Sequence, residues 1–415
     1  MSYGPTVSHY RREHAPNRYY LPSDLSATDM YKDFQSIHGD TAATYVLYCK
    51  KMREMKISLV KLGKEECELC VTTIQHQKNM GHTDTIATEI CSTCSSYNEH
   101  KRIAEMCRVA YRSDGETALP DTLVLAVDLQ KVIQLPRIEG LKSIIFSQRL
   151  LAFNQTFAPA GKYTKSFPVV ACTWDESTAG RSANDITSTF QKVILHYSKM
   201  KKITFWMDNC AAQNKNWNLF LHLILLVNCK EVEVQEITLK YFETGHTFMA
   251  ADSYHAAVEK KMKTKAPVTI DDFKDVLECA EKNVTVFQMH HQDFFETRQQ
   301  ISQYALKNIH PRPYMDKMKQ VVIQKGSYAL KYGDSLNMGA VLGSVMLFTK
   351  KQLKVVSSTS FDLFQDLHFK QLPRGIELKR KTALLKVIFP VIEEDKKEYW
   401  KTLAEKETSD TDEDK

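Results

Sequence analysis

The chain has 415 residues, of which 43% are hydrophobic and 26% are charged, and its formal net charge is +6. These values are typical of a folded protein with two or three cores, and they exclude collagen-like, mucin-like and largely disordered chains. The longest apolar run, Leu219–Cys229, is shorter than the roughly 18–20 residues of a spanning helix, so no membrane anchor is expected.

The amino-terminal region, residues 1–60, is predicted to be helical. One helix is expected in SDLSATDMYKDF, where Ser23 or Ser26 could serve as its cap, and a second in TAATYVLYCKKMREM. The first residues lack the apolar segment of a secretory signal, so we expect an intracellular protein, nuclear or cytoplasmic, with reduced cysteines.

Residues 61–115 contain the closely spaced cysteines and are too polar to close a core unaided. The spacing C-x2-C-x5-H occurs twice there, and paired thiolates of this kind bind structural Zn²⁺. The predicted zinc ligands are Cys67, Cys70, Cys91 and Cys94. His76 and His100 could replace one thiolate in either pair, or could bind a second ion. The isolated cysteines are expected to be small core residues: Cys49, Cys107, Cys172, Cys210, Cys229 and Cys279.

Residues 120–266 alternate short apolar runs with helical patterns, which indicates a mixed α/β sheet. Strands are expected at TLVLAVDLQ, SIIFSQRLLAFNQTF, SFPVVACTW, KITFWMD and EITLKYF. Helices are expected at SANDITSTFQKVILHYSKM, NKNWNLFLHLILLVN and AADSYHAAVEKKMK. Three strands followed by helix, strand, helix, strand, helix is the element order of a ribonuclease H-like fold.

Residues 267–400 are predicted to form a small α+β appendage. A helix is expected at IDDFKDVLECAEKN and a strand at VTVFQM, followed by short apolar runs such as AVLGSVMLF and ALLKVIFPVI. Residues 401–415 are expected to form an acidic disordered tail.

Two aspartates, Asp128 and Asp208, each end an apolar run that is predicted to be a strand. Strand ends in an α/β sheet are where ligands bind, and two carboxylates there can share a hard divalent cation. Each alone is more often a turn or a helix cap. Together they predict a site for Mg²⁺ or Mn²⁺.

The third carboxylate is expected from the helix after the fifth strand. Asp252 lies at the start of that helix and Glu259 seven residues later, so both project from one face. Asp252 could instead be an N-cap, and Glu259 could pair with Lys263 on the surface. His246 could orient a phosphate or protonate a leaving group, or could only bond within its turn.

Other polar side chains allow two interpretations. Gln213, Asn214 and Asn216 could contact a phosphate backbone or cap the helix that follows them. The basic stretches AVEKKMKTK and ELKRKTALLK could follow a nucleic-acid backbone or form solvated helix surfaces.

Four sequence blocks carry a resemblance: VDLQKV with LPR after it, RLLAFNQTFAP, WMDNCAAQNKNWNLF and KYFETGHTFMAADSYHAAVE. With the paired CxxC segment ahead of them, they resemble a family of uncharacterised, transposon-derived animal proteins. The resemblance spans about residues 67–263, and DNCxxQNKN and GHTxxxxDS are its specific parts. The core of that family is regarded as an integrase-like, ribonuclease H-type domain of unknown function.

The resemblance implies a DDD- or DDE-type transposase, with Asp128 and Asp208 as the first two metal ligands. The GHTxxxxD motif makes Asp252 the preferred third ligand over Glu259. Such proteins often carry a longer amino-terminal region that could hold the DNA-binding module, and this chain has a shorter one. DNA is the expected partner, and related enzymes act as homo-oligomers on paired DNA ends.

Three hypotheses follow from the sequence. The first is a metal-dependent nuclease or polynucleotidyl transferase that cleaves DNA and transfers strands. The second is a domesticated, catalytically inactive protein that binds DNA or protein and keeps a structural zinc site. The third is a zinc-containing exonuclease that uses the same acidic residues on RNA.

Overall fold

A computed structural model describes most of the chain. The described residues are 6–7, 19–21, 27–39, 43–55, 57–59, 67–82, 91–138, 144, 147–161, 166–210, 213–295, 309, 313–337, 339–358, 362–366 and 368–406. The proposed caps Ser23 and Ser26 and most of the predicted acidic tail lie outside these ranges.

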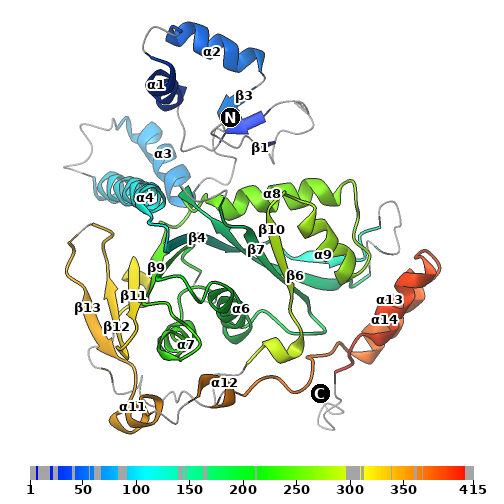
Figure 1. Cartoon of the computed structure of the whole chain (residues 1–415). Coiled ribbons are helices and arrows are strands. Elements are labelled where there is room, and N and C mark those ends of the chain that lie inside the picture. Colours follow the sequence, from blue (N-terminus) through cyan, green and yellow to red (C-terminus); the bar gives the residue numbers. More distant parts are fainter. Residues whose placement is uncertain are drawn as a thin grey trace. The chain divides into compact units, whose positions relative to one another are not determined.

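The chain divides into two compact units (Figure 1). Unit 1 comprises Met1–Arg108 with two short later segments, Glu243–His246 and His255–Ala257. Unit 2 comprises the rest of the chain, beginning at Val109. Unit 1 contains the closely spaced cysteines between Cys67 and Cys94, and unit 2 contains the large sheet.

Unit 1 contains four helices and a small sheet among its described residues. The helices are α1 (Ala27–His38), α2 (Tyr45–Glu54), α3 (Glu68–Met80) and most of α4 (Ser92–Thr117). The strands β1 (Thr6–Val7), β2 (Tyr19–Leu21) and β3 (Ile57–Leu59) pair in that order. The two helices predicted before residue 60 are confirmed, and the small sheet is an addition to the predicted helical region.

The core of unit 2 is a mixed sheet whose five central strands lie where the sequence predicts them. They are β4 (Thr122–Leu129), β6 (Leu150–Pro159), β7 (Val169–Asp175), β8 (Lys202–Met207) and β9 (Glu236–Tyr241). Their spatial order is β7-β6-β4-β8-β9. The strands β7, β6 and β4 are antiparallel neighbours, whereas β8 and β9 run parallel to β4.

Helices cover both faces of this sheet (Figure 1). On one face, α6 (Ala183–His196) and α7 (Trp217–Asn228) contribute to the larger apolar cluster. On the other, α8 (Ala250–Met262) and α9 (Ile270–Glu278) belong to a second cluster together with α13 (Leu378–Ile388) and α14 (Glu394–Thr402). Because both faces are covered, the central strands are apolar nearly throughout, as parallel strands usually are.

Local signals explain where these helices begin. Ser182 and Asp185 form a reciprocal capping box at the start of α6, and Thr269 and Asp272 form another at the start of α9. The side chain of Asn216 accepts a hydrogen bond from the Leu219 N–H at 3.0 Å and so caps α7.

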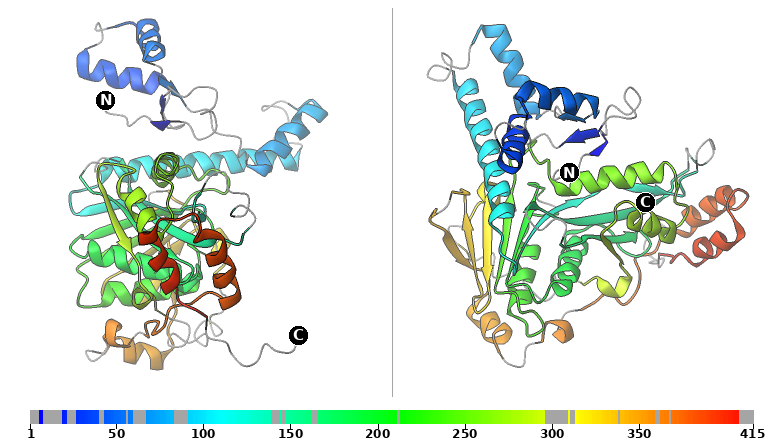
Figure 2. Two further views of the ribbon diagram at one scale, coloured as in Figure 1. Left: turned by 90° about the vertical axis from the view of Figure 1, so that its right-hand side faces the viewer. Right: turned by 45° about the horizontal axis from the view of Figure 1, so that its top comes forward.

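Residues after 267 extend the sheet and form no separate appendage. The strand β10 (Val284–Gln288) pairs with β7 at one edge. At the other edge, β11 (Gln320–Gln324), β12 (Ala329–Gly333) and β13 (Gly343–Met346) continue outward from β9 (Figure 2). The short β5 (Ile133–Leu135), which the sequence analysis did not predict, pairs with β6. The predicted α+β appendage is thus corrected, because its strands complete both edges of the core sheet.

Short helices connect the remaining elements: η2 (His291–Asp293), η3 (Met315–Lys317), α11 (Lys350–Val356) and α12 (Leu363–Asp366). The start of the predicted tail is ordered, because α14 continues to Thr402 and Glu405 pairs with Ile376. Within the described ranges, no helix combines the length and apolar character required to cross a membrane.

Candidate metal centres

Two aspartates, Asp128 and Asp208, lie at the ends of adjacent strands in unit 2. In the register of β4 and β8, Val127 lies opposite Met207. Asp128 and Asp208 each come directly after those residues, so they occupy the same level of neighbouring parallel strands. The sequence predicted that Asp128 and Asp208 lie at strand ends, and the register of β4 and β8 agrees with this placement.

Asp252 comes to the same place from α8. Carboxylate oxygens of Asp128 and Asp252 lie within 4.8 Å of each other, close enough for both to contact one cation. Asp252 also accepts a hydrogen bond from the Met249 N–H at 2.8 Å, so it caps the helix as well. The capping role and the place beside Asp128 are therefore compatible.

The two neighbouring carboxylates affect the charge of Asp128. Burial, followed by the negative charges of Asp252 and Asp208, raises the pKa of Asp128 to about 8. A carboxyl group in this environment holds its proton near neutral pH unless a positive charge compensates for the neighbouring carboxylates. A divalent cation would supply that charge, so the donor set fits a metal ion with oxygen ligands.

Asp208 is held by its own motif, DNCAAQNKN. Its Oδ1 accepts hydrogen bonds from the Cys210 N–H at 3.1 Å and from the Asn214 side-chain amide at 2.6 Å. Asn214 is only 1% exposed. Lys215 is equally buried and donates to Asn209 at 2.9 Å, with its ammonium group over the ring of Tyr241. The motif thus builds the loop that carries Asp208.

This arrangement decides between the two interpretations of the polar residues after Asp208. Asn214 is buried against Asp208, so it is not exposed to a phosphate backbone. Asn216 caps α7, as its alternative interpretation required. Gln213 supplies a backbone carbonyl to the Asn216 side chain.

Glu259, the alternative third carboxylate, belongs to no potential metal-binding group among the described residues, and neither does Asp208. The causes that raise the pKa of Asp128 include Asp252 and Asp208 and do not include Glu259. His255, which the sequence analysis did not single out, lies one turn after Asp252 on the same face of α8. Burial lowers the pKa of His255 to about 3, so its imidazole is neutral. A helical i, i+3 pair of Asp and His is the signal that would have identified it.

Unit 1 contains two further clusters, each with two cysteines and two histidines. The first Cys/His group consists of Cys67, Cys70, His100 and His246. The second Cys/His group consists of His76, His82, Cys91 and Cys94. Within each group, one potential ligand atom from every residue lies within 4.8 Å of the others.

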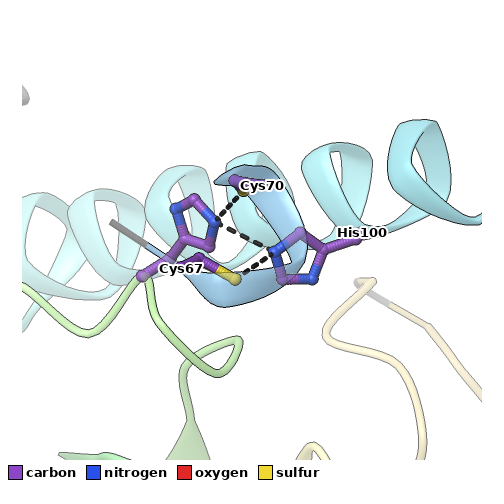
Figure 3. A group of neighbouring side chains, drawn as sticks. Cys67, Cys70 and His100 are labelled. Atoms are coloured by element: carbon purple, nitrogen blue, oxygen red, sulfur yellow. Dashed lines mark hydrogen bonds between the residues drawn. The ribbon is translucent and has the colours of Figure 1, made fainter. Parts of the chain in front are cut away.

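In the first group, three residues come from two helices (Figure 3). Cys67 is the residue before α3, and Cys70 lies three residues later, so both thiols share one side of the helix start. The sulfur of Cys67 is 3.3 Å from His100 Nε2, and that of Cys70 is 3.4 Å from His246 Nε2. The two Nε2 atoms are 3.0 Å apart.

These separations are close to those of a tetrahedral zinc site. With Zn–S of about 2.3 Å and Zn–N of about 2.0–2.1 Å, tetrahedral geometry places S and N ligands roughly 3.6 Å apart and two N ligands roughly 3.4 Å apart. The four donors of the first group therefore surround a point that could hold such an ion.

Neighbouring residues orient the first group. His100 is 7% exposed, and its Nδ1 lies 3.0 Å from a carboxylate oxygen of Glu243. Arg108 donates to the backbone carbonyl of His246 at 2.8 Å. Gly245 has φ of +77°, and a Cβ there would lie 2.6 Å from the Cβ of Cys67. Only glycine allows the loop to approach Cys67 this closely.

In the second group, each cysteine lies beside one histidine. The sulfur of Cys91 is 3.2 Å from His76 Nε2, and that of Cys94 is 3.5 Å from His82 Nδ1. A hydrogen bond from the Cys94 backbone is the largest cause that lowers the pKa of Cys91, to about 6. A lowered thiol pKa favours the thiolate, which is the form that binds metals.

The predicted four-cysteine site is therefore corrected. Cys67 and Cys70 lie in one group and Cys91 and Cys94 in the other, because each CxxC pair meets a histidine from the opposite helix. Of the alternatives left open by the sequence, a second ion bound with His76 and His100 is the one that these groups fit.

Two histidines of these groups were not expected there. The sequence left open whether His246 orients a phosphate, protonates a leaving group or only bonds within its turn, and its side chain lies beside Cys70 in the first group. His82 was overlooked, because it lies outside the repeated x5 spacing and follows Gly81, whose left-handed backbone ends α3. A histidine directly after a helix-ending glycine, between two CxxC pairs, is the signal that could have identified it.

The isolated cysteines differ in burial. Cys107 and Cys172 are buried, Cys49, Cys210 and Cys229 are half-buried, and Cys279 is exposed. The core role predicted for isolated cysteines therefore holds for the first two.

The basic stretch from Glu377 to Lys386 contributes partly to the fold. Arg380 pairs with Glu176, and buried Lys381 pairs with Glu405 at 2.9 Å. In the other stretch, Lys265 pairs with Asp275 at 2.7 Å.

Comparisons with known proteins give few matches. A comparison with curated proteins finds no match to the chain. A solved structure titled "Crystal structure of NurA" aligns with 71% of this chain and 55% of its own, at 9% identity and a TM-score of 0.15. Residues 172–332, from β7 to β12, match the family model described as "Domain of unknown function (DUF7869)". The matched segment includes Asp208 and Asp252, and this part of the chain is therefore similar to that family.

Proposed function

We propose that unit 2 is a ribonuclease H-like, metal-dependent nuclease or polynucleotidyl transferase of the DDD/DDE type, in a chain of transposon origin, with DNA as its substrate. The observation that carries the proposal is the pair Asp128 and Asp252, whose carboxylate oxygens lie within 4.8 Å of each other, with Asp208 at the same level of the neighbouring strand and close enough for its charge to raise the pKa of Asp128. Carboxylates at that place are what two-metal phosphoryl transfer requires.

The topology of the sheet supports the same proposal. Three antiparallel strands are followed by two strands parallel to the first, in the order β7-β6-β4-β8-β9, with helices after the third, fourth and fifth. This is the strand order expected of a ribonuclease H-like core. The acidic residues lie on the central strand, on its parallel neighbour and on the helix after the fifth strand, as the sequence resemblance implies.

The residues have distinct proposed roles. Asp128 and Asp252 would hold Mg²⁺ or Mn²⁺ between them, and Asp208 would complete the carboxylate set from the adjacent strand. Bound divalent cations activate the attacking oxygen and stabilise charge on the leaving oxygen of a phosphodiester. Asn214 and the Cys210 N–H fix one oxygen of Asp208, so this carboxylate is already oriented.

The cysteine-rich unit is proposed to contribute structure. We infer that the first Cys/His group binds Zn²⁺, because two thiolates and two imidazoles at tetrahedral separations are a zinc donor set. Glu243 beside His100 matches the carboxylate–histidine–metal arrangement that is common around zinc.

DNA cleavage by the purified full chain tests the proposed function. Linear duplex ends and supercoiled plasmid would be incubated with Mg²⁺ or Mn²⁺, and the wild type compared with Asp208→Asn. The matched control is Asp121→Asn, which changes an exposed acid in the turn before β4. The proposal predicts metal-dependent cleavage that Asp208→Asn reduces at least a hundredfold and Asp121→Asn leaves unchanged.

Two other results would overturn this assignment. DNA or protein binding that does not depend on Asp208, without cleavage under any metal condition, would support the inactive, domesticated protein. Preferential loss of RNA in a mixture of RNA and DNA would support the exonuclease hypothesis. Circular dichroism of each variant would first establish that it is folded.

A further inference from the structure

The second Cys/His group has a complete donor set of its own. It contains two sulfurs and two imidazole nitrogens, from His76, His82, Cys91 and Cys94, all within 4.8 Å of one another. The sulfur of Cys91 lies 3.2 Å from His76 Nε2, and the sulfur of Cys94 lies 3.5 Å from His82 Nδ1. A tetrahedral zinc ion would require roughly 3.6 Å. None of the four residues belongs to the first group.

The helix α3 has little else to hold it in place. Among its residues, only the side chain of Thr73 is buried. Apolar side chains of the same helix are exposed, including Leu69, Val71, Ile74 and Met80. A helix of 13 residues with so little buried apolar surface requires another source of stability.

The two groups lie near opposite ends of α3. The first group uses Cys67 and Cys70 at its start, and the second uses His76 and, beyond its end, His82. The second group is completed by Cys91, directly before α4, and Cys94 in the first turn of α4, whereas the first group uses His100, further along α4, and His246 from a later loop. Two ions would therefore fasten α3 to α4 at both ends.

The ligands of the second group are nested within those of the first along the chain. From His76 to Cys94 the separation is 94 − 76 = 18 residues, whereas from Cys67 to His246 it is 246 − 67 = 179 residues. A site closed by a short loop has a smaller entropic cost of assembly than one closed by a long loop. The second group should thus bind its ion independently of the distant loop that supplies His246.

We propose that the second Cys/His group is a separate structural Zn²⁺ site, so that each chain binds two zinc ions in unit 1. This site fixes the end of α3 to the start of α4. It binds metal whether or not the first group is intact, and it does not depend on the proposed nuclease activity.

Zinc content of the full chain, expressed with zinc and measured by mass spectrometry of the metal, tests the proposal. The wild type should contain two zinc ions per chain. His82→Ala and His246→Ala should each contain one, and the double variant should contain none. Cys49→Ser is the matched control, because Cys49 lies in unit 1 outside both groups, and it should retain two.

A conservative variant separates loss of a ligand from loss of the fold. His82→Cys keeps a zinc-binding side chain, so it should restore the second ion that His82→Ala loses. In the Co²⁺-substituted protein, the visible absorption of tetrahedral Co²⁺ should fall by about half in His82→Ala and recover in His82→Cys. One zinc per wild-type chain, or a content that His82→Ala does not change, would overturn the proposal.

Discussion

The Nδ1 atom of His100 lies 3.0 Å from a carboxylate oxygen of Glu243, while the Nε2 atom of the same ring lies 3.3 Å from the sulfur of Cys67. A carboxylate on one nitrogen fixes the tautomer in which the other nitrogen is free to bind a metal. Glu243 lies two residues after the end of β9 and 143 residues after His100 in the sequence. Glu243 is therefore expected to orient the His100 ring as a metal ligand.

Replacement of Glu243 tests this orientation. Glu243→Gln keeps the size of the side chain but removes the charge, so the first Cys/His group should lose roughly 10- to 100-fold in zinc affinity. Competition with a chelator would measure the release of each ion. Glu233→Gln, which changes an exposed glutamate paired with Lys201, is the control and should have no effect. Equal release of zinc from Glu243→Gln and the wild type would show that Glu243 does not support the site.

Asp128 should destabilise the metal-free protein. Its pKa is raised from that of an unfolded chain to about 8, so between pH 4 and 8 the folded state binds more protons than the unfolded state. The bound proton on Asp128 favours the folded state at low pH, and this contribution to the free energy of unfolding is lost as the pH rises through this window. Asp128→Asn removes the charge and should increase the free energy of unfolding at pH 7 by roughly 2–4 kcal/mol.

Thermal unfolding in a divalent-free buffer containing no strong chelator, so that zinc is retained, would measure this effect. Added Mn²⁺ should raise the melting temperature of the wild type and leave that of Asp128→Asn unchanged. Asp121→Asn provides the same change of charge at an exposed position. A lower melting temperature for Asp128→Asn than for the wild type without Mn²⁺ would contradict the raised pKa.

The strand-end aspartates could be predicted because short-range signals specify them. Asp128 and Asp208 each terminate an apolar run, and parallel strands bring such ends together. The capping residues of α6, α7 and α9 likewise stand where the sequence places helix starts. The sequence does not show that the strands after residue 267 pair with the edges of the core sheet. Edge strands join a sheet through long-range pairing, and the periodicity of a strand does not encode its partner.

The pairing of cysteines with histidines could not be predicted in the same way. The C-x2-C-x5-H spacing occurs twice and suggests that each repeat uses its own histidine. In the structure, each CxxC pair instead meets the histidine of the other repeat, which lies on the other helix. His246 comes from a loop 176 residues after Cys70. Ligands so distant in sequence are brought together by the fold, and local spacing carries no information about them.

Asn214 should act as a positioning residue for Asp208. Its amide donates to Asp208 Oδ1 at 2.6 Å from a position that is 1% exposed. Asn214→Ala removes this hydrogen bond, so Mn²⁺ affinity should fall roughly 10-fold or more while zinc content stays unchanged. Asn218→Ala, which removes a hydrogen bond to Asn184 on α6, is the control. Identical Mn²⁺ affinities of Asn214→Ala and the wild type would exclude the positioning role.

His222 should make the fold sensitive to acid. It is fully buried in α7, stacked on Phe295 with ring centroids 4.2 Å apart, and neither ring nitrogen has a hydrogen-bond partner in the described part of the chain. Burial lowers its pKa to about 3. Between pH 3 and 6.5 the unfolded state therefore binds a proton that the folded state does not, and stability falls as the pH falls.

His222→Phe should remove this contribution. Between pH 7 and pH 5, His222 lowers the free energy of unfolding of the wild type by about 2 kcal/mol. The free energy of unfolding of His222→Phe should therefore fall by about 2 kcal/mol less than that of the wild type over the same pH range. Urea unfolding at pH 7 and pH 5 would give the two differences. A parallel decline of wild type and variant would show that the acid sensitivity comes from other groups.

Calorimetric titration of the zinc-loaded full chain with Mn²⁺, comparing the wild type with Asp208→Ala, tests the central proposal most directly. Circular dichroism and zinc content would first confirm that both proteins are folded. The account predicts saturable Mn²⁺ binding to the wild type that is lost, or weakened at least 10-fold, in Asp208→Ala. Equal binding by both proteins, or none by either, would contradict an acidic metal centre formed by Asp128, Asp208 and Asp252.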